Sequence, residues 1–136
     1  MKIRYTKQIE GSPVVQFVAL AWVALMKDGQ WDRNSVLVSP ELQCVFAVDG
    51  RKIVGCLTFH IEETQAIINI AYVVPSHRGR GVYRQLHAAF IEHAKEQEAT
   101  EALNICYPSN DGIQETCKKL GYKPYVVHWT LPIGDK

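Results

Sequence analysis

The stretch Ala71-Tyr-Val-Val-Pro-Ser-His-Arg-Gly-Arg-Gly-Val-Tyr-Arg-Gln-Leu86 decides how this chain folds. It begins inside residues 66–74, an Ile- and Val-rich run that is typical of a central strand buried on both faces. Pro75 ends that strand, and Gly79 and Gly81 allow the tight turn that follows. A strand that leads through a glycine turn into a helix directs free backbone N–H groups and the helix dipole toward one point. The sequence therefore predicts an anion-binding site at this turn.

The charges around the turn favour a ligand with more than one anionic group. Arg78, Arg80 and Arg84 add three positive charges, and no acidic residue occurs between Asn69 and Phe90. A diphosphate suits such a turn, because its two phosphates accept hydrogen bonds from several donors at once. The nucleotide-binding pattern GxxxxGK[ST] is absent from the chain, and the dinucleotide pattern fails because Arg84 replaces its third glycine.

Hydrophobic periodicity and turn signals predict the element order β-α-β-β-β-α-β-α-β. Three consecutive strands favour an antiparallel meander, and the β-α-β units after them favour at least one parallel pair. We therefore expect an α/β fold with a mixed central β-sheet flanked by helices on both faces. Strands are expected at residues 3–6, 44–48, 53–61, 66–74, 102–107 and 125–131, with a hairpin turn at Asp49-Gly50, and helices at residues 13–27, 79–97 and 110–120.

The composition is that of one ordinary globular domain spanning residues 1–136. A chain of 136 residues can bury a substantial core but is too short for two such domains. Apolar residues make up 47% of the chain and charged residues 21%, which excludes wholesale disorder. Fifteen Lys and Arg nearly balance fourteen Asp and Glu, so the net charge of +1 argues against a basic coat for nucleic acid.

The four cysteines predict no metal site. Cys44, Cys56, Cys106 and Cys117 form no CxxC pair, and none lies near a histidine at zinc-finger spacing. Each cysteine interrupts an apolar or helix-like stretch. We therefore interpret them as reduced, mostly buried thiols, which suits a cytoplasmic protein.

The apolar run at residues 14–26 has two interpretations. Basic residues precede it, as in a signal peptide. However, Glu10 lies before the run, residues 27–30 follow it without a small-residue cleavage site, and its length falls short of the about 20 residues that a bilayer requires. Ser12-Pro13 also suits an N-cap followed by the first helical position. We favour a buried helix of a soluble domain over a targeting segment, and we expect no membrane partner.

Two separated motifs resemble those of the GNAT family of N-acetyltransferases. Arg78-Gly-Arg-Gly-Val-Tyr83, after a strand that ends in Val73-Val74-Pro75, resembles the family pattern Gln/Arg-x-x-Gly-x-Gly/Ala. The match fails at the last position, where Tyr83 replaces Gly or Ala. Asn110-Asp-Gly-Ile-Gln-Glu-Thr-Cys-Lys-Lys-Leu-Gly-Tyr122 resembles the family segment Asn…Tyr-x-Lys-Leu-Gly-Phe/Tyr, with Cys117 at the position of the tyrosine. The resemblance covers roughly residues 44–131.

The resemblance implies acetyl-CoA as cosubstrate, bound in a cleft where the parallel strands at residues 66–74 and 102–107 splay apart. It implies an acetyltransferase that passes the acetyl group to a primary amine of a small molecule or a protein, by direct attack in a ternary complex. The implied cofactor-binding groups are the backbone around Tyr72, Val73 and Val74 for the pantetheine arm, the N–H groups of Arg78, Gly79, Arg80, Gly81, Val82 and Tyr83 for the diphosphate, and Asn110 near the pantetheine end.

Acid–base catalysis would assist such a transfer. An amine with a pKa of about 10.4 is almost wholly protonated at pH 7, so a base that removes its proton is useful. Glu63 is the first candidate, because the family often has a carboxylate just before the central strand, and His60 is the second. The departing thiolate benefits from an acid, for which Cys117 and Tyr107 are candidates. A solvated turn, a packed thiol and a strand-end aromatic explain these residues without catalysis.

Two other functions are compatible with the same residues. The first is a non-catalytic acyl-CoA-binding or interaction module with the same fold, which the changes at Tyr83 and Cys117 favour. The second is a small nucleic-acid-binding domain that uses the three arginines of the turn. Only Tyr83 is available to stack on bases beside those arginines, so we expect no nucleic acid partner.

Several aromatic and histidine residues also have structural explanations. Trp22 suits the core or the interface of a homodimer. An acceptor pocket and the core are equally good explanations for Trp31, Tyr122, Tyr125 and Trp129. A solvated or phosphate-facing edge is expected for His77, Arg84 and His87.

Overall fold

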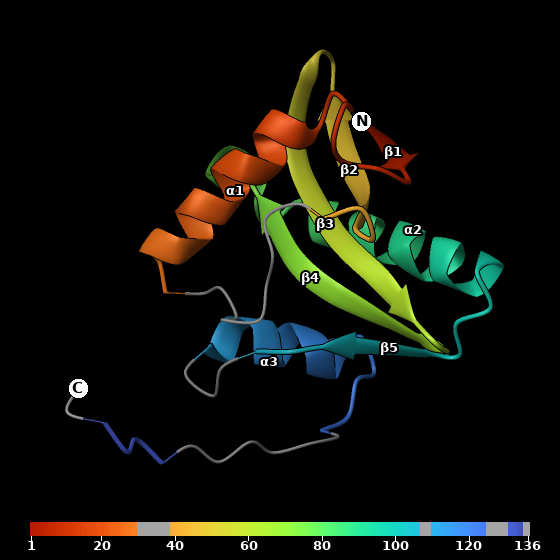
Figure 1. Ribbon diagram of the computed structural model, residues 1–136. Helices are drawn as coiled ribbons and strands as arrows, with labels where there is room; N and C mark the ends of the chain where they lie inside the picture. The colour runs from red at the N-terminus through yellow and green to blue at the C-terminus, as the bar shows by residue number, and fades with distance from the viewer. Residues whose placement is uncertain (30–38, 107–109, 125–130, 135–136) are drawn as a thin grey trace.

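One mixed β-sheet organises the part of the chain that the structure, a computed structural model, describes: residues 1–29, 39–106, 110–124 and 131–134. Within these residues the sheet has five strands that are neighbours in chain order: β1 (Lys2–Thr6), β2 (Gln43–Asp49), β3 (Lys52–Glu62), β4 (Gln65–Val73) and β5 (Glu101–Asn104). The pairs from β1 to β4 are antiparallel, and β4 and β5 are parallel (Figure 1). The predicted mixed sheet is confirmed.

The β2–β3 hairpin forms at the predicted turn. Asp49 pairs with Lys52, which leaves Gly50 and Arg51 as the loop. Gly50 has a φ of +63°, a left-handed conformation that glycine adopts without the steric cost of a Cβ. The turn residue therefore explains the hairpin locally.

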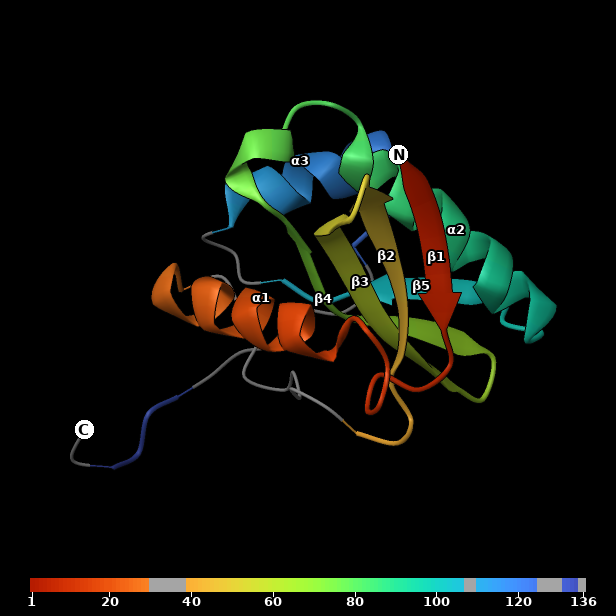
Figure 2. The same cartoon turned by 90° about the horizontal axis from the view of Figure 1, so that it is seen from above.

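Helices cover both faces of the sheet, as predicted. α1 (Val15–Lys27) crosses one face and α2 (Val82–Glu96) the other, which the two views in Figures 1 and 2 show. A short 3₁₀ helix, η1 (Pro75–His77), follows β4, and α3 (Asp111–Lys119) follows β5. The β4–η1–α2–β5 unit supplies the parallel pair of the sheet, the only one among the described residues.

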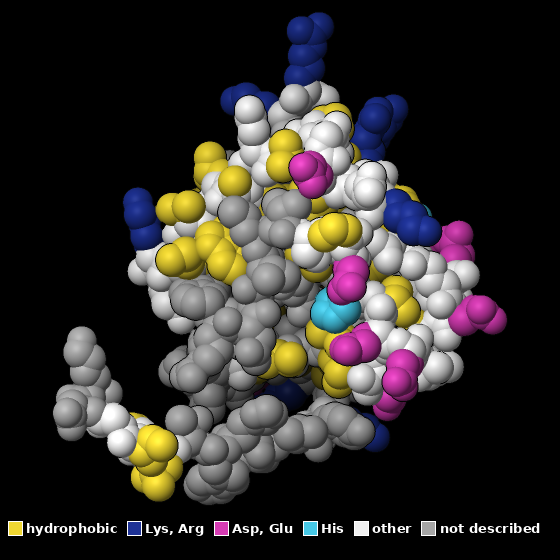
Figure 3. All heavy atoms as spheres, in the orientation of Figure 1, with side chains coloured by type: hydrophobic (Ala, Val, Ile, Leu, Met, Phe, Trp, Pro, Cys, Tyr) yellow, Lys and Arg dark blue, Asp and Glu magenta, His cyan; other side chains and the backbone are white. Residues whose placement is uncertain are grey.

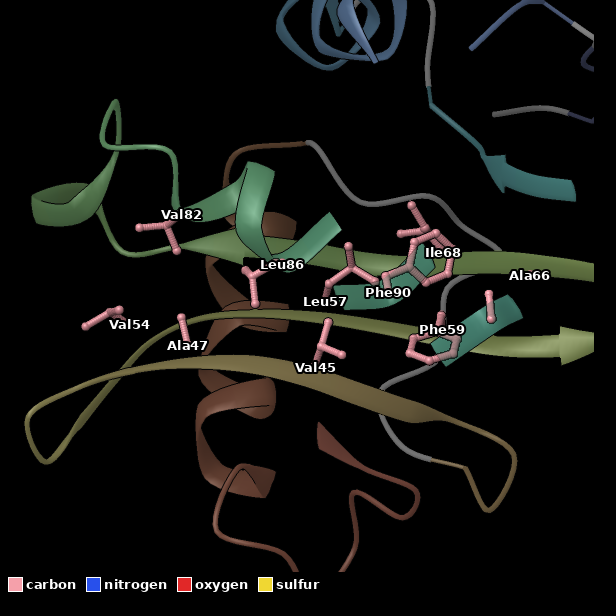
Figure 4. Close-up of a cluster of buried hydrophobic side chains, with 11 residues drawn as sticks. Val45, Ala47, Val54, Leu57, Phe59, Ala66, Ile68, Val82, Leu86 and Phe90 are labelled. Atoms are coloured by element: carbon pink, nitrogen blue, oxygen red, sulfur yellow. The ribbon is translucent and has the colours of Figure 1, made fainter. Parts of the chain in front are cut away.

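The core between the sheet and α2 is built from alternate strand residues and one stripe of the helix. The rings of Phe59 on β3 and Phe90 on α2 meet edge to face, with centroids 5.0 Å apart. Figure 4 shows how the side chains of β2, β3 and β4 point toward those of α2. The cluster consists of Val45, Ala47, Val54, Leu57, Phe59, Ala66, Ile68, Val82, Leu86, Phe90 and Ala94.

The opposite face of the sheet packs against α1. Val18, Ala21 and Leu25 are buried there, at the spacing of one helix face. The other side of α1 carries Leu20 and Val23 exposed, and Figure 3 shows hydrophobic side chains on the surface over this helix. The apolar run at residues 14–26 thus forms a helix packed on the sheet, as we favoured. In the described ranges no helix has the length and hydropathy to cross a membrane.

The N-terminus of α1 differs from the prediction that Ser12 caps the helix. The helix begins at Val15, and its N-cap residue is Val14, which has no side-chain capping bond. Ser12 instead closes the preceding turn, because its Oγ donates to the Ile9 carbonyl (2.6 Å) and accepts from the Val14 N–H (3.3 Å). This turn accompanies the burial of Ile9, which is 1% exposed, so the hydroxyl serves the turn rather than the helix.

A register shift in β4 changes which side chains face each helix. Thr58 pairs with Ile70 and Phe59 pairs with Ile68, so Asn69 is the extra residue of a β-bulge, and its Nδ2 donates to Thr58 Oγ1 (3.0 Å). As a result Ile68 belongs to the core under α2, whereas Ile70 belongs to the core under α1. The predicted burial of β4 on both faces is confirmed, and the bulge decides the face of each residue.

Gly55 on β3 allows α2 to lie close to the sheet. A Cβ at this position would lie 3.2 Å from Leu86 Cδ1, 3.2 Å from Val82 Cγ1 and 3.3 Å from the Tyr72 carbonyl oxygen. Val82 and Leu86 belong to the first half of α2. The glycine therefore sets how near the N-terminus of α2 comes to β3.

We expect Gly55→Val to lower the free energy of unfolding by about 1–3 kcal/mol, because the larger side chain overpacks the contact with α2. Urea unfolding of the variant measures this change. Gly134→Val is the matched control, since nothing lies within 4 Å of a Cβ at that position. Equal stability of the two variants would show that the contact at Gly55 is loose.

Candidate functional site

A cleft opens where β4 and β5 part. The two strands pair only over Gln65–Ile68 and Glu101–Asn104, and Figure 1 shows them diverging beyond that point. The cleft has a volume of about 420 Å³. Its walls come from residues 68–73 of β4, from residues 104–106, and from the start of α3, with Tyr83 of α2 beside them. The predicted splaying of the two parallel strands is thus present.

The second half of β4 presents a free strand edge to this cleft. The Val74 N–H donates to the Val54 carbonyl (2.9 Å), so at this residue the backbone turns toward β3. Because backbone groups alternate along a strand, those of Val73 and Ala71 turn away from β3, toward the cleft. The sequence analysis expected the backbone of Tyr72, Val73 and Val74 to bind the pantetheine arm. Of these three residues, only Val73 has backbone groups that face the cleft, and the Val74 N–H is already bonded to β3.

The loop before α2 has the conformation that the glycines predicted. Gly79 and Gly81 have φ values of +75° and +79°, and Gly81 is the N-cap of α2. The sequence analysis expected this helix to begin at residue 79, whereas it begins at Val82. The first N–H groups of the helix, on Val82 and Tyr83 among others, have no intrahelical acceptor, and no side chain of the described residues caps them. Such an end favours an anion.

Arg78 joins this loop to β4. Its Nε donates to the Val73 carbonyl oxygen (2.8 Å), and its guanidinium lies 5.4 Å from the centroid of the Tyr72 ring. The residue also lines the cleft. A fixed positive charge thus lies between the loop and the free edge of β4.

A second contact anchors the loop to the β2–β3 hairpin. His77 Nε2 lies 2.8 Å from Asp49 Oδ2, and Ser76 Oγ lies 2.9 Å from His77 Nδ1. The hydrogen bond with His77 lowers the pKa of the Asp49 carboxyl. These contacts attach η1, which precedes the loop, to the β2–β3 hairpin. The position of His77 is consistent with the edge expected from the sequence.

Asn110 holds the start of α3 at the cleft. Its side-chain oxygen accepts from the Ile113 N–H (3.2 Å), so it caps the helix that the sequence predicted to begin at residue 110, and it lines the cleft. At the other end of α3, the Gly121 N–H donates to Lys118 and the Tyr122 N–H donates to Cys117. With Gly121 at a φ of +93°, this is a Schellman ending, and the helix ends within one residue of the predicted residue 120.

Tyr83 turns its side chain inward. The residue lines the cleft, and its hydroxyl oxygen is buried without a hydrogen-bond partner among the described residues. Burial raises the pKa of Tyr83 to about 12; the Cys117 thiol adds to this, and the Asn104 amide opposes it. The Asn104 nitrogen is directed to Cys117 Sγ (3.4 Å), which leaves the phenol as an unpaired donor beside the cleft.

His87 is buried, which corrects the expectation of a solvated or phosphate-facing edge. It is 8% exposed, and its Nε2 lies 2.7 Å from the Tyr122 hydroxyl oxygen. Burial lowers the pKa of His87. The spacing of Tyr83, His87 and Phe90 on one helix face was the signal for this position. Tyr122 therefore joins α3 to α2 rather than bordering an acceptor pocket.

Two of the four cysteines lie near the cleft. Cys44 and Cys56 are buried under α1, whereas Cys106 and Cys117 are half-buried, so the expectation of buried thiols holds for the first pair only. Burial raises the pKa of Cys117, and its sulphur accepts from Asn104 (3.4 Å). The thiol is thus a weak acid in its present contacts, and among described residues Cys106, not Cys117, lines the cleft.

The structure does not bring Glu63 to the cleft. Glu63 lies exposed in the β3–β4 turn with a φ of +55°, at the end of β4 that still pairs with β5. Six residues separate it from Asn69, which corresponds to about 20 Å along an extended chain. His60 is on the neighbouring part of β3, 3.8 Å from Glu62. Figure 3 shows acidic side chains gathered on this side of the molecule, away from α1.

The remaining candidates lie elsewhere. Tyr107, Trp31, Tyr125 and Trp129 and most of the expected strand at residues 125–131 lie outside the described residues. Trp22 packs half-buried against the core under α1.

Comparison with known proteins identifies the family. The sequence model of the acetyltransferase (GNAT) family matches residues 15–122. The chain belongs to the acetyltransferase (GNAT) family. The family, the fold class, the class of enzyme and acetyl-CoA as its cosubstrate are therefore confirmed as predicted. No curated protein matches the chain closely enough to count as a relative.

Solved GNAT structures share the fold of the chain. AAC(6')-Iy in complex with the bisubstrate analogue CoA-S-monomethyl-acetylneamine has a TM-score of 0.70 at 19% identity, covering 97% of this chain and 98% of that one. An aminoglycoside acetyltransferase from an uncultured soil metagenomic sample, in complex with sisomicin, has a TM-score of 0.75 at 17% identity, covering 98% and 96%. Ribosomal-protein-alanine N-acetyltransferase from Brucella melitensis biovar Abortus 2308 has a TM-score of 0.69 at 14% identity, covering 95% of this chain and 100% of that one.

The raised pKa of Tyr83 predicts a late-titrating phenol. The phenol ionises near its usual pKa of about 10 in the unfolded chain and at about 12 in the folded protein. The neutral form therefore stabilises the fold below pH 10, and this stability is lost as the pH rises toward 12.

Ultraviolet titration of tyrosinate should show one fewer late-titrating group in Tyr83→Phe than in the wild type. The variant should also lose less stability between pH 10 and pH 12 in urea unfolding. Loss of a group that titrates near pH 10, rather than of a late-titrating one, would place the Tyr83 hydroxyl in solvent.

Proposed function

We propose that this GNAT protein transfers the acetyl group of acetyl-CoA to a primary amine, by direct attack of the amine in a ternary complex. The observation that carries the proposal is the free edge of β4 beside an uncapped, glycine-started helix. An amide-bearing arm can accept from the Val73 N–H, since the Val73 carbonyl already accepts from Arg78 Nε, and a diphosphate can accept from the loop at residues 78–83. The residues present therefore fit a coenzyme A thioester.

Each element has a separate part in holding this cosubstrate. Gly79 and Gly81 leave the loop without side chains that would cover the backbone N–H groups, and Arg80 adds a charge that suits a phosphate. Asn110, which lines the cleft at the start of α3, is placed to contact the pantetheine arm. Acetyl-CoA supplies the activated acyl group, and the chain orients it against the acceptor.

The proton of the acceptor amine needs another route than Glu63, because Glu63 lies at the far end of β4. No carboxylate or imidazole occurs among the described residues that line the cleft. We therefore propose that water in the open cleft takes this proton. An amine of low pKa then reacts faster than a lysine-like amine, since a larger fraction is neutral at pH 7.

Acceptor amines can be tested directly. Purified protein is incubated with acetyl-CoA and each of three probes: sisomicin, a peptide with an N-terminal alanine, and a linear polyamine. The first two are suggested by the structural neighbours. Release of the coenzyme A thiol with formation of the acetylated amine supports the proposal. Binding of acetyl-CoA without turnover of a broad amine panel favours the non-catalytic acyl-CoA-binding module instead.

We expect Arg80→Ala to weaken acetyl-CoA binding by about 1–3 kcal/mol, roughly 5- to 150-fold, because a charge-assisted bond to phosphate is lost. Isothermal titration calorimetry measures the dissociation constant. Lys95→Ala removes the same charge at the other end of α2, where Lys95 makes only an exposed contact with Glu92, and should leave binding unchanged. An unchanged dissociation constant in Arg80→Ala would remove Arg80 from the diphosphate site.

A further inference from the structure

The segment between β4 and α2 is held by a contact from a distant part of the chain. Residues 75–81 are exposed apart from His77, which is partly buried. His77 Nε2 lies 2.8 Å from Asp49 Oδ2 in the β2–β3 hairpin, 28 residues earlier in the chain. The bond from Arg78 to the Val73 carbonyl spans only five residues. Among the described residues, the Asp49 contact is therefore the hydrogen bond by which this segment reaches beyond β4 and α2.

The contact fixes the orientation of the His77 ring. A carboxylate only accepts hydrogen bonds, so the proton on His77 Nε2 is donated to Asp49. This bond lowers the pKa of the Asp49 carboxyl, and the charge of Arg80 contributes to the same shift, so the carboxyl is ionised at neutral pH. Ser76 Oγ lies 2.9 Å from the other ring nitrogen. Both nitrogens of His77 thus have partners, which leaves the ring little freedom to turn.

Asp49 is carried on a rigid part of the sheet. It pairs with Lys52 across the hairpin loop, in which Gly50 has a left-handed conformation. Val54, near the start of β3, accepts from the Val74 N–H (2.9 Å) at the end of β4. The hairpin and the end of β4 therefore belong to one continuous sheet, and the carboxylate offers a fixed point to the segment that leaves this sheet.

The part of the loop that precedes α2, residues 78–81, is called the diphosphate loop below. It contains Gly79 and Gly81, and glycine has more conformations open to it than other residues, so ordering this loop on a ligand costs conformational entropy. His77 fixes the chain before the loop, and Val82, which is 2% exposed under α2, fixes the chain after it. A loop held at both ends has fewer conformations to lose when a ligand binds.

We propose that Asp49 is a positioning residue for the cosubstrate: through His77 it holds the diphosphate loop in its binding conformation before acetyl-CoA arrives. This role rests on the proposed function. It requires no contact between Asp49 and the ligand. Because the anchor is at the diphosphate end of the site, it acts on the affinity for acetyl-CoA and leaves the rate of acetyl transfer unchanged.

The test uses the full chain with acetyl-CoA. Asp49→Ala should raise the dissociation constant and the KM of acetyl-CoA by about 3- to 10-fold, as expected for one lost hydrogen bond, with kcat for the best acceptor amine unchanged. Asp49→Asn should bind nearly as well as the wild type, because the amide oxygen still accepts from His77. Glu62→Ala is the matched control: it removes a carboxylate that lies 3.8 Å from His60 at the other end of β3, and should change neither constant.

Three further measurements separate positioning from general damage. The double variant Asp49→Ala with His77→Ala should bind no more weakly than either single variant, since all three lack the same bond. S-acetylpantetheine, which lacks the diphosphate, should react with the wild type and with Asp49→Ala at equal kcat/KM. Amide hydrogen exchange of the ligand-free protein should be faster at residues 75–81 in Asp49→Ala than in the wild type. His77→Ala makes the same tests from the other partner, should Asp49→Ala fail to fold.

The outcomes separate the two proposals. Wild-type protein that binds no acetyl-CoA overturns the proposed function and the role of Asp49 together. Wild-type affinity in Asp49→Ala overturns only the role of Asp49. The same holds if the losses in the double variant add, or if Asp49→Asn binds as weakly as Asp49→Ala, because the carboxylate would then act through its charge rather than through His77. An equal loss with S-acetylpantetheine also overturns the role, since the diphosphate loop would not be its target.

Discussion

The separation of β4 from β5 is the constraint on which the site depends. A paired strand has its backbone groups occupied, so a sheet offers a ligand no hydrogen bonds as long as its ladder continues. Here the parallel ladder stops after Ile68 and Asn104, and the bulge at Asn69 follows directly. The remainder of β4 keeps its partner β3 on one side and exposes a free edge on the other. That edge is what allows an extended, amide-bearing ligand to be held inside the fold.

Packing then determines where the anion-binding end of the site lies. Gly55 allows the first turns of α2 to lie against β3, and the Arg78–Val73 bond joins the loop to the same strand that supplies the free edge. The Asp49–His77 contact adds a second attachment from the β2–β3 hairpin. The helix N-terminus and the strand edge are therefore fixed relative to each other by three separate contacts. A ligand with a diphosphate at one end and a thioester at the other requires such a fixed separation.

The polar groups inside the cleft are neutral donors and acceptors. Tyr83, Asn104 and Asn110 lie on its walls, and Arg78 at the loop brings a positive charge. The carboxylates of the β3–β4 turn are remote from it. Among the residues that the structure describes, the site is thus suited to holding a long, polar, uncharged arm. These lining residues include no carboxylate or imidazole that could remove a proton from a strongly basic amine. Such a site favours an acceptor amine of lower pKa, a larger fraction of which is neutral.

The sequence by itself determined the local elements and the donor loop. The Ile- and Val-rich strand, the Asp49-Gly50 turn, the glycines before α2 and the Asn110 and Gly121 ends of α3 act through neighbours within a few residues, so their patterns are readable in one dimension. Motif spacing similarly identified the family and its cosubstrate.

Only the tertiary structure decided which side chains meet. The bulge at Asn69, the burial of His87 against Tyr122 and the convergence of Tyr83 with Cys117 each join positions from different elements, and a one-residue shift in a strand reverses the face of everything after it. Glu63 is a further example. Its position just before β4 suggested a catalytic base, but it lies at the end of β4 that pairs with β5, away from the cleft. Chemistry at this site depends on distances through space, and those are set by packing between elements rather than by order along the chain.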